Sequence, residues 1–315
     1  MKVSVVIPCF NVEHYLDRCL VGIFAQTHRD LEVIAVDDGS TDRTGAMLLE
    51  AGARSPFPFE VMTQQNAGAC AARNAGMAKA TGTYVQFMDA DDALLPEKIA
   101  HQVLLAGTNG APDLIVGSAR TYDATGTLTN TDVQRSTDRD VWMDLMRHRL
   151  GGTPTNLWKR SMMEAVGGWN VNMKSSQEYD LMFRFLQHDA HLLFDAEVLT
   201  DIHIRDGGSV STSRLDGTWT RFIELRTRII DHIAHARPGT DLHPYHQVLF
   251  DSIRTLYPHA PREAVALYRK HLPKDFKPGT SPATGKGYLL LHRLLGFSLA
   301  NRVRQLFSGR VASRP

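Results

Sequence analysis

Two carboxylates separated by one residue, Asp89 and Asp91, directly follow a hydrophobic stretch, Tyr84–Met88. Mg²⁺ and Mn²⁺ prefer oxygen ligands, and one or two carboxylates often hold such an ion together with substrate phosphates. The same two residues also fit an acidic loop that caps a helix beginning near Pro96. The pair alone therefore predicts either a metal–phosphate site or a helix start.

Three further polar clusters follow apolar stretches of the first hundred residues. They are Pro8, Phe10 and Asn11 after Val3–Ile7, Asp37 to Asp42 after Leu31–Val36, and Gln64 to Gly76 after Phe59–Met62. In a doubly wound sheet, ligands bind outside the carboxyl ends of the strands, so we expect these clusters to converge on one edge. Unpaired buried charges are costly, and the convergence therefore favours a cation or polar ligand over an acidic turn.

Two residues of these clusters have both a structural and a functional interpretation. Asp38 is either part of a capped turn or the acceptor for a ring N–H of a nucleobase. Arg73 lies in the alanine-rich, helical segment Ala69–Ala80, where it makes either a surface ion pair or a contact to a diphosphate or base.

Alternating strand and helix signals must position these clusters. Apolar strands are predicted at Val3–Ile7, Leu31–Val36, Phe59–Met62, Tyr84–Met88 and Leu114–Val116, with helices between them. We expect Asn11 and Thr41 to cap the first two helices. This rhythm predicts an α/β fold, a mostly parallel sheet with helices on both faces.

The rhythm breaks after about residue 120. Residues 121–138 are polar and predict a loop or hairpin, and the helical segments that follow are 139–149, 160–166, 178–188, 216–236, 243–256, 261–271 and 287–307. The fold class is therefore α/β followed by a helical C-terminal region.

Composition excludes several classes of protein. Of 315 residues, 43% are hydrophobic and 22% charged, and the net charge is +1, so no nucleic-acid partner is expected. No apolar stretch approaches the roughly 20 residues that span a bilayer. The three cysteines are read as reduced core thiols, which predicts a cytoplasmic protein. No G-x-G-x-x-G follows the first strand, which disfavours a dinucleotide dehydrogenase.

The last 39 residues differ from the rest in charge. Between Lys277 and Pro315 there are seven Lys or Arg residues and no Asp or Glu, interleaved with leucines and aromatic residues. A basic helix with a broad apolar face suits an anionic membrane surface. The alternative is a helix packed on the protein's own core with a solvated basic edge.

Five stretches in order resemble the inverting nucleotide-sugar glycosyltransferases of family 2 type, which have the GT-A fold. They are VSVVIPCFN (3–11), QTHRDLEVIAVDDGSTD (26–42), QNAGACAARNAG (65–76), YVQFMDADDALLP (84–96) and GGWN (167–170). The resemblance covers about residues 1–212. It implies a hexosyltransferase that moves a sugar from a nucleotide-sugar donor to a glycan or lipid-linked acceptor. Among the nucleotides, the resemblance favours UDP.

The resemblance also implies roles for residues of the matched stretches. Pro8 and Phe10 would flank the base with Glu13 near it, and Asp38 would bond the base. Arg73 would lie close to the nucleotide, and Asp89 would bind ribose or metal-linked groups. Asp91 would ligate the Mn²⁺ or Mg²⁺ that holds the diphosphate. In polysaccharide biosynthesis such an enzyme would act at the inner face of the membrane, as a peripheral protein.

The family's base lies in a pattern like E-D-x-D-L, which here reads Gln177-Glu178-Tyr179-Asp180-Leu181. Glu178 holds the position usually taken by Asp, and we expect it to be the base, with Asp180 as the second candidate. Another interpretation is that these acids only stabilise a helix N-terminus. Further along, His203 to Arg205 and the segment 208–211 resemble a part that folds over the diphosphate.

The expected organisation has three parts. Residues 1–212 form the GT-A domain, with a nucleotide-binding half at 1–120 and an acceptor half at 121–212, followed by a helical extension at 213–276 and the basic tail at 277–315. Two other functions stay open: a nucleotide-sugar hydrolase, in which water replaces the acceptor, and a non-catalytic nucleotide-sugar-binding or scaffolding module.

Overall fold

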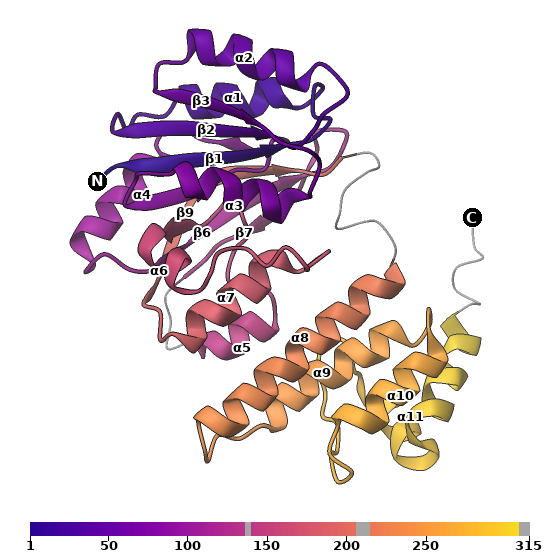
Figure 1. Ribbon diagram of the computed structural model, residues 1–315. Coiled ribbons are helices and arrows are strands. Elements are labelled where there is room, and N and C mark those ends of the chain that lie inside the picture. Colours follow the sequence, from indigo (N-terminus) through magenta and orange to yellow (C-terminus); the bar gives the residue numbers. More distant parts are fainter. Residues whose placement is uncertain (136–139, 206–214, 309–315) are drawn as a thin grey trace. The chain divides into compact units, whose positions relative to one another are not determined.

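The computed structural model describes residues 1–135, 140–205 and 215–308 (Figure 1). The chain divides into two compact units, Met1–Val210 and Ser211–Pro315. All the candidate site residues lie in the first unit. The predicted division at residues 212 and 276 stays a prediction. Helix α11 (Lys286–Ser308), which lies in the basic tail, belongs to the second unit together with the helices before it.

A single mixed sheet organises the first unit. Its order is β3-β2-β1-β4-β8-β6-β9-β5, and β7 pairs with β6. The strands are β1 (Val3–Cys9), β2 (Leu31–Asp37), β3 (Phe59–Thr63), β4 (Tyr84–Phe87), β5 (Ala93–Leu94), β6 (Leu114–Tyr122), β7 (Leu128–Asp132), β8 (Leu157–Lys159) and β9 (Leu192–His203).

Parallel pairing places the predicted loops at one edge. Strands β3, β2, β1 and β4 are all parallel, and β6 is parallel to β9. The short strand β8 runs antiparallel to both β4 and β6 and joins the two parts of the sheet. Since Cys9 pairs with Asp37, and Asp37 with Thr63, the ends of β1, β2 and β3 lie level with one another.

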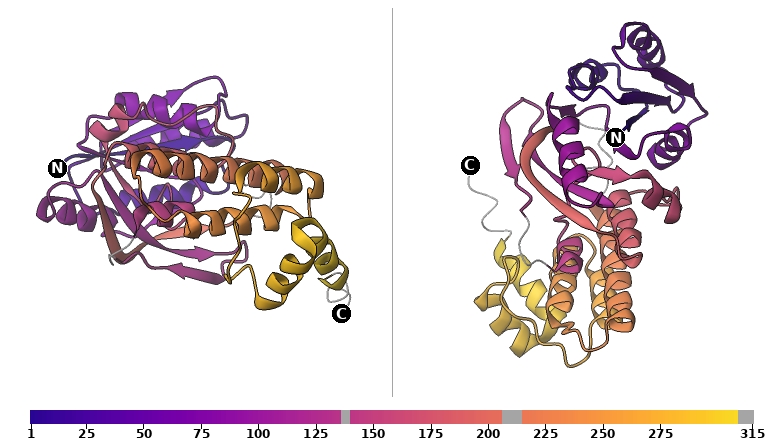
Figure 2. Two further views of the ribbon diagram at one scale, coloured as in Figure 1. Left: turned by 90° about the horizontal axis from the view of Figure 1, so that it is seen from below. Right: turned by 90° about the vertical axis from the view of Figure 1, so that its left-hand side faces the viewer.

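Helices cover both faces of the sheet (Figures 1 and 2). Val3, Val5 and Ile7 point to one face, where they share a core with residues of α1 (Leu16–Phe24), α2 (Thr44–Arg54) and α4 (Lys98–Thr108). Helix α3 (Ala69–Lys79) packs on the other face. Its Gly76 is required there, because a Cβ would lie only 2.5 Å from Cγ1 of Val6.

The remaining helices of the first unit are α5 (Val141–Met146), α6 (Arg160–Ala165) and α7 (Gln177–Gln187). The polar segment predicted as a loop or hairpin forms the β6–β7 hairpin in its described part. Strands β5, β8 and β9 were not among the predicted strands. The pattern of β9 conceals it, because only two of its twelve residues, Asp195 and Thr200, are fully buried.

Two capping predictions are wrong. Asn11 has a left-handed backbone, with φ of 50°, and the residue that caps α1 is Tyr15. Thr41 lies ahead of α2, whose cap is Arg43. Asn11 and Thr41 instead bond to each other, because the Oδ1 atom of Asn11 accepts a hydrogen bond of 2.8 Å from the Thr41 amide.

The second unit is helical in its described part. Its helices are α8 (Leu215–Ala236), α9 (His243–Leu256), α10 (Pro261–His271) and α11 (Lys286–Ser308), with α8 and α9 packed as a hairpin (Figure 2). These bounds agree closely with the predicted helices. None of the helices in the described ranges has the length and apolar character that crossing a membrane requires.

Candidate functional site

Asp38 fixes the start of helix α3. Its buried carboxylate accepts hydrogen bonds from Nε2 of Gln64 at 2.7 Å, from the Ala67 amide at 2.9 Å and from the Gly68 amide at 2.8 Å. A carboxylate has about four acceptor positions, so these three bonds leave one for a ligand. Contact between Asp38 and a base stays a prediction, and the structure adds a positioning role for this residue.

The loops after β1 and β2 are bonded to each other. The Asn11 amide donates to Oγ of Ser40 at 3.0 Å, in addition to the bond between Asn11 and Thr41. Oε2 of Glu13 accepts a hydrogen bond from the Arg43 amide at 3.0 Å, so Glu13 holds the start of α2. Pro8 is partly exposed at the end of β1, and Phe10 beside it is 47% exposed, which leaves its ring available to a planar ligand.

Arg73 connects three of the predicted stretches. Its Nη2 atom lies 2.7 Å from Oδ1 of Asp89, and its Nη1 atom donates to Oε1 of Gln177 at 3.0 Å. Its guanidinium also lies over the Trp169 ring, 4.6 Å from the centroid. The buried Nε atom of Arg73 has no hydrogen-bond partner among the described residues. The α3 helix, the loop after β4, the GGWN stretch and the start of α7 therefore meet at one cation.

The acidic loop after β4 is crowded with negative charge. Burial and the negative charge of Asp89 raise the pKa of Asp91. Burial and the negative charges of Asp89 and Asp91 raise the pKa of Asp92 well above its usual range. Three cations offset this repulsion. Arg73 pairs with Asp89, and the Nε atom of Arg205 lies 2.5 Å from Oδ2 of Asp91. Arg18 donates to the Asp91 carbonyl oxygen and lowers the pKa of Asp92.

Asp92 has a structural role that the sequence analysis missed. Its buried Oδ1 atom accepts a hydrogen bond of 2.8 Å from the His203 amide. This bond ties the end of β9 to the acidic loop and brings Arg205 to Asp91. Arg205 also lies over the Tyr15 ring, 4.4 Å from its centroid. Arg205 belongs to the stretch compared with the diphosphate segment, whereas the rest of that segment, 208–211, falls outside the described residues.

A divalent ion fits this loop only as part of a larger ligand set. Asp89 and Asp91 are accessible, with 32% and 21% of their side chains exposed. Within the described ranges, no group of three or more His, Cys, Asp or Glu side chains is arranged to hold a metal. Two carboxylates suffice for Mg²⁺ or Mn²⁺ where phosphates and water supply the other ligands, and the donor set of this loop fits that case.

The two candidate bases differ in their surroundings. Asp180 is buried and paired with Arg184, whose Nε atom lies 3.0 Å from Oδ2 of Asp180. Arg184 in turn donates to the carbonyl oxygens of Val166 and Gly168, so this pair holds the GGWN stretch. Burial raises the pKa of Glu178, and the nearby Asp89 raises it further, while Arg73 lowers it. A carboxylate with a raised pKa beside the acidic loop suits a general base.

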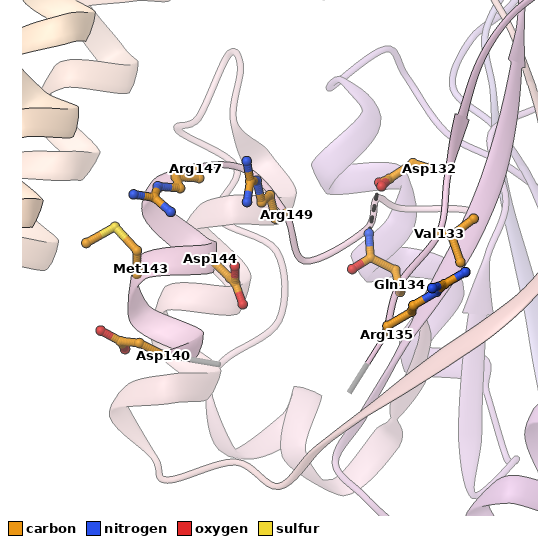
Figure 3. A pocket seen from close by; sticks show the side chains of 9 residues that line it. All are labelled: Asp132, Val133, Gln134, Arg135, Asp140, Met143, Asp144, Arg147 and Arg149. Atoms are coloured by element: carbon orange, nitrogen blue, oxygen red, sulfur yellow. Dashed lines mark hydrogen bonds between the residues drawn. The ribbon is translucent and has the colours of Figure 1, made fainter. Parts of the chain in front are cut away.

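A hollow of about 610 Å³ lies beside these elements, between the end of β7 and α5 (Figure 3). Arginine and aspartate side chains dominate its lining, and its residues are Asp132, Val133, Gln134, Arg135, Asp140, Met143, Asp144, Arg147 and Arg149. The loop after α5 contacts α7. The ring of His148 stacks on the ring of Tyr179, the residue after Glu178, with the centroids 4.1 Å apart.

A second hollow of about 410 Å³ lies between α1 and α2 and includes Glu13, Arg43 and Arg54 in its lining. Neither hollow is lined by Asp38, Arg73, Asp89 or Asp91. These four residues are brought together instead through α3, because Asp38 holds its first turn and Arg73 reaches Asp89 from its second.

Comparison with known proteins identifies the family of the chain. The model of the family described as Glycosyl transferase family 2 matches residues 4–170, more than half of the chain. An uncharacterised glycosyltransferase of Nostoc sp. is 38% identical over 133 residues, which cover 40% of this chain and 41% of the relative. The chain thus matches about two fifths of that relative's length.

Two solved structures share the fold. TarS 1–349 of S. aureus in complex with UDP-GlcNAc has a TM-score of 0.67 at 17% identity, covering 98% of this chain and 92% of that one. The mannosyltransferase PcManGT of Pyrobaculum calidifontis, in complex with GDP-Man and Mn²⁺, has a TM-score of 0.51 at 20% identity, covering 98% and 87%. With the family match, these likenesses confirm the predicted fold class: the chain belongs to Glycosyl transferase family 2 and has the GT-A fold.

Proposed function

We propose that this glycosyltransferase moves a hexose from a UDP-linked donor to a hydroxyl group of a glycan or lipid-linked acceptor, with inversion at the anomeric carbon. The observation that supports this proposal best is the set of contacts around Arg73. One buried guanidinium joins the acidic loop to Gln177, the residue before the candidate base, and its charge also lowers the pKa of Glu178.

In the proposed arrangement, the base of the donor lies against Pro8 and the exposed ring of Phe10, near Glu13, and bonds to the remaining acceptor position of Asp38. The diphosphate lies between Arg73 and Arg205. Both arginines now pair with carboxylates, and both offer the planar donor geometry that suits phosphate oxygens. Asp89 and Asp91 would hold Mn²⁺ or Mg²⁺, which supplies positive charge to the leaving diphosphate.

The residues of this chain then perform a single displacement. The acceptor oxygen forms a bond to C1 of the sugar as the bond between C1 and the diphosphate oxygen breaks, and the electron pair leaves with the diphosphate. Glu178 takes the proton of the acceptor hydroxyl. Attack from the side opposite the leaving group inverts the configuration at C1. Arg73 and Arg205 stabilise the charge that develops on the departing oxygens.

Gln177 bears on the choice between a catalyst and a binding module. It replaces an acid of the family's pattern, yet its Oε1 atom accepts a hydrogen bond from Arg73 and its Nε2 atom donates to the Met173 carbonyl oxygen. A neutral amide at this position leaves Arg73 one carboxylate partner instead of two. More of its charge is then available to a diphosphate, so the substitution is compatible with donor binding.

The acceptor is proposed to enter through the hollow between β7 and α5. Its lining adjoins His148, which stacks on Tyr179, the residue after Glu178. The lining is polar and carries both charges, as expected for a surface that receives hydroxyl-rich or phosphate-bearing groups rather than an apolar ligand.

A thermal-shift comparison tests the donor assignment. We expect UDP-hexoses to raise the melting temperature of the protein in the presence of Mn²⁺, because a ligand that binds only the folded state stabilises it. Asp91→Asn should remove most of the Mn²⁺-dependent part of the shift. No shift with any UDP- or GDP-sugar would contradict the proposal.

Turnover assays separate the proposed transferase from its alternatives. Rapid release of sugar without an acceptor would identify a nucleotide-sugar hydrolase, and donor binding with no turnover on any acceptor would identify a binding module.

A further inference from the structure

Helix α11 has a row of leucines that the described part of the second unit leaves exposed. Leu290, Leu294, Leu299 and Leu306 are 59%, 71%, 47% and 70% exposed. The helix consists of two segments joined at Gly296, whose φ of 71° is outside the helical range. Exposed leucines occur in both segments, so they are a property of the whole element rather than of one frayed end.

In each segment the exposed leucines share a face with cations. Leu290 and Leu294 are four residues apart, and Lys286 precedes Leu290 by the same interval, which places all three on one side of the first segment. In the second segment Leu299, Arg302 and Leu306 follow one another at intervals of three and four. Lys286, Arg293, Arg302 and Arg304 are all exposed.

The opposite side of α11 accounts for how the helix is held in the second unit. Tyr288 and Phe297 are buried, and their ring centroids lie 6.2 Å and 5.9 Å from that of Phe250 in α9. The Arg254 guanidinium lies 3.9 Å from the Tyr288 centroid. The unit's core therefore uses the aromatic side of α11, and the leucine side is left for another partner.

Charge identifies that partner. Residues 277–315 contain seven Lys or Arg residues and no Asp or Glu. A second copy of the same face would bring two sets of like charges together, which opposes self-association through it. The leucines require an apolar partner and the lysine and arginines an anionic one. The boundary of a bilayer that contains anionic lipids offers both, acyl chains for the leucines and phosphates for the cations.

We infer that the exposed leucines and cations of the two α11 segments bind an anionic membrane surface: Leu290, Leu294, Lys286 and Arg293 in the first segment, and Leu299, Leu306 and Arg302 in the second. Each segment places its leucines among the acyl chains and its cations at the phosphates. This inference concerns the second unit and is independent of the donor chemistry proposed for the first.

Vesicle flotation of the full chain tests the inference. The protein should float with phosphatidylcholine vesicles that contain about a third phosphatidylglycerol, and should stay at the bottom with phosphatidylcholine alone. Raising the salt to about 0.5 M should reduce flotation, because salt screens exposed charges. The double variant L294E/L299E should lose at least tenfold in the vesicle-bound fraction.

A matched variant controls for the added charge. Leu49 in α2 and Leu104 in α4 are 66% and 64% exposed, and L49E/L104E introduces the same two carboxylates outside α11. This control should float like the unmodified chain. Circular dichroism and the donor-induced thermal shift should be the same for both double variants, which separates a failure of this inference from a failure of the proposed function.

Three results would overturn the inference. They are equal flotation with neutral and anionic vesicles, equal flotation of the two double variants, and no flotation at all. Light scattering that shows a dimer abolished by L294E/L299E, without vesicle binding, would assign the face to a second copy instead.

Discussion

Arg73 illustrates how one side chain of this protein serves both structure and reaction. It is buried, yet it contacts Asp89, Gln177 and the Trp169 ring, which come from three separate parts of the chain. A buried charge without partners would be strongly destabilising. The contacts that offset the cost of burying this charge also bring the residues of the candidate site together. A donor would therefore meet a guanidinium that is already oriented.

Glu178→Gln tests the proposed base. We expect kcat to fall by about 10²–10⁴-fold, the usual contribution of general base catalysis, while the donor-induced thermal shift is kept. In the unmodified enzyme the rate should fall as the pH is lowered through the pKa of Glu178, because only the ionised carboxylate accepts a proton. Since burial raises that pKa, the fall should be centred above the ordinary value of 4.5.

Two comparisons make this measurement decisive. Glu164→Gln changes an exposed glutamate of α6 and should leave the rate unchanged. Asp180→Asn removes the partner of Arg184 and should act mainly on stability. A nearly normal rate for Glu178→Gln, together with a normal pH profile, would show that another group is the base.

At the residue scale, the sequence selected candidate site residues by type and order but did not predict the contacts among them. Asp38, Arg73, Asp89 and Asp91 could be selected because polar residues at the ends of parallel strands converge. Asp92 and Arg18 could not be selected in this way. Their roles depend on the His203 amide and the Asp91 carbonyl oxygen, and backbone atoms leave no mark in the side-chain pattern.

At the scale of elements, helix α3 is the part that positions the residues proposed to bind the donor. Its first turn is held by Asp38 and its second carries Arg73, and Gly76 allows it to lie close to Val6 and Val36. The alanine-rich composition predicted this helix, and the close approach explains the composition, because larger side chains would hold α3 away from β1.

Gly76→Ala should therefore affect both stability and donor binding. The added Cβ would lie 2.5 Å from Cγ1 of Val6, and we expect the free energy of unfolding to fall by about 1–3 kcal/mol, as for other overpacked cores. Urea denaturation measures this change. Gly152→Ala is the control, because nothing lies within 4 Å of a Cβ at that position. Equal midpoints for the two variants would contradict the role given to Gly76.

The hollow beside α5 leads to a prediction about the acceptor. Arg147→Ala should raise the KM for the acceptor about tenfold, the effect expected from losing one charged hydrogen bond, and leave the KM for the donor unchanged. Arg54→Ala is a matched control, because Arg54 lines the other hollow, between α1 and α2. If the donor KM rises instead, the hollow belongs to the donor site.

Elements with a strong period were predicted well, and short or half-exposed ones were not. The bounds of α9 and α10 agree with the prediction because the apolar spacing and the flanking prolines and glycines are clear. Strands β5 and β8 have two and three residues, too few to show a period. The caps of α1 and α2 were misassigned because Asn11 and Thr41 bond across loops instead of within a helix.

At the scale of the whole molecule, Glu32 links distant parts of the first unit. Its carboxylate accepts hydrogen bonds from Oγ of Ser4 at 2.6 Å and from the Thr81 amide at 2.7 Å, and it pairs with Lys2. Burial alone would raise its pKa, but these partners outweigh burial and lower the pKa of Glu32 to about 2.

This shift makes stability depend on pH. A carboxylate with a lowered pKa in the folded state contributes stability above its unfolded pKa, near 4.5, and the contribution is lost as the pH falls toward 2. Glu32→Gln should therefore lower the melting temperature at pH 7 by about 2–4 °C, with the difference disappearing near pH 2. Glu60→Gln, at an exposed position of β3, should show no such difference. If Glu32→Gln lowers the melting temperature equally at pH 7 and near pH 2, the ionised carboxylate of Glu32 is not the source of the stability.

Strand β8 has a practical consequence for following the enzyme at work. Trp158, its middle residue, pairs with Val85 on one side and with Leu114 on the other, and its indole is fully buried against Phe87 and Phe185. This three-residue strand joins β4 to β6, so a change of twist between these two strands alters the surroundings of the indole. An indole shielded from water changes its emission when its surroundings change, so the fluorescence of Trp158 offers a way to follow this part of the sheet when a donor is added.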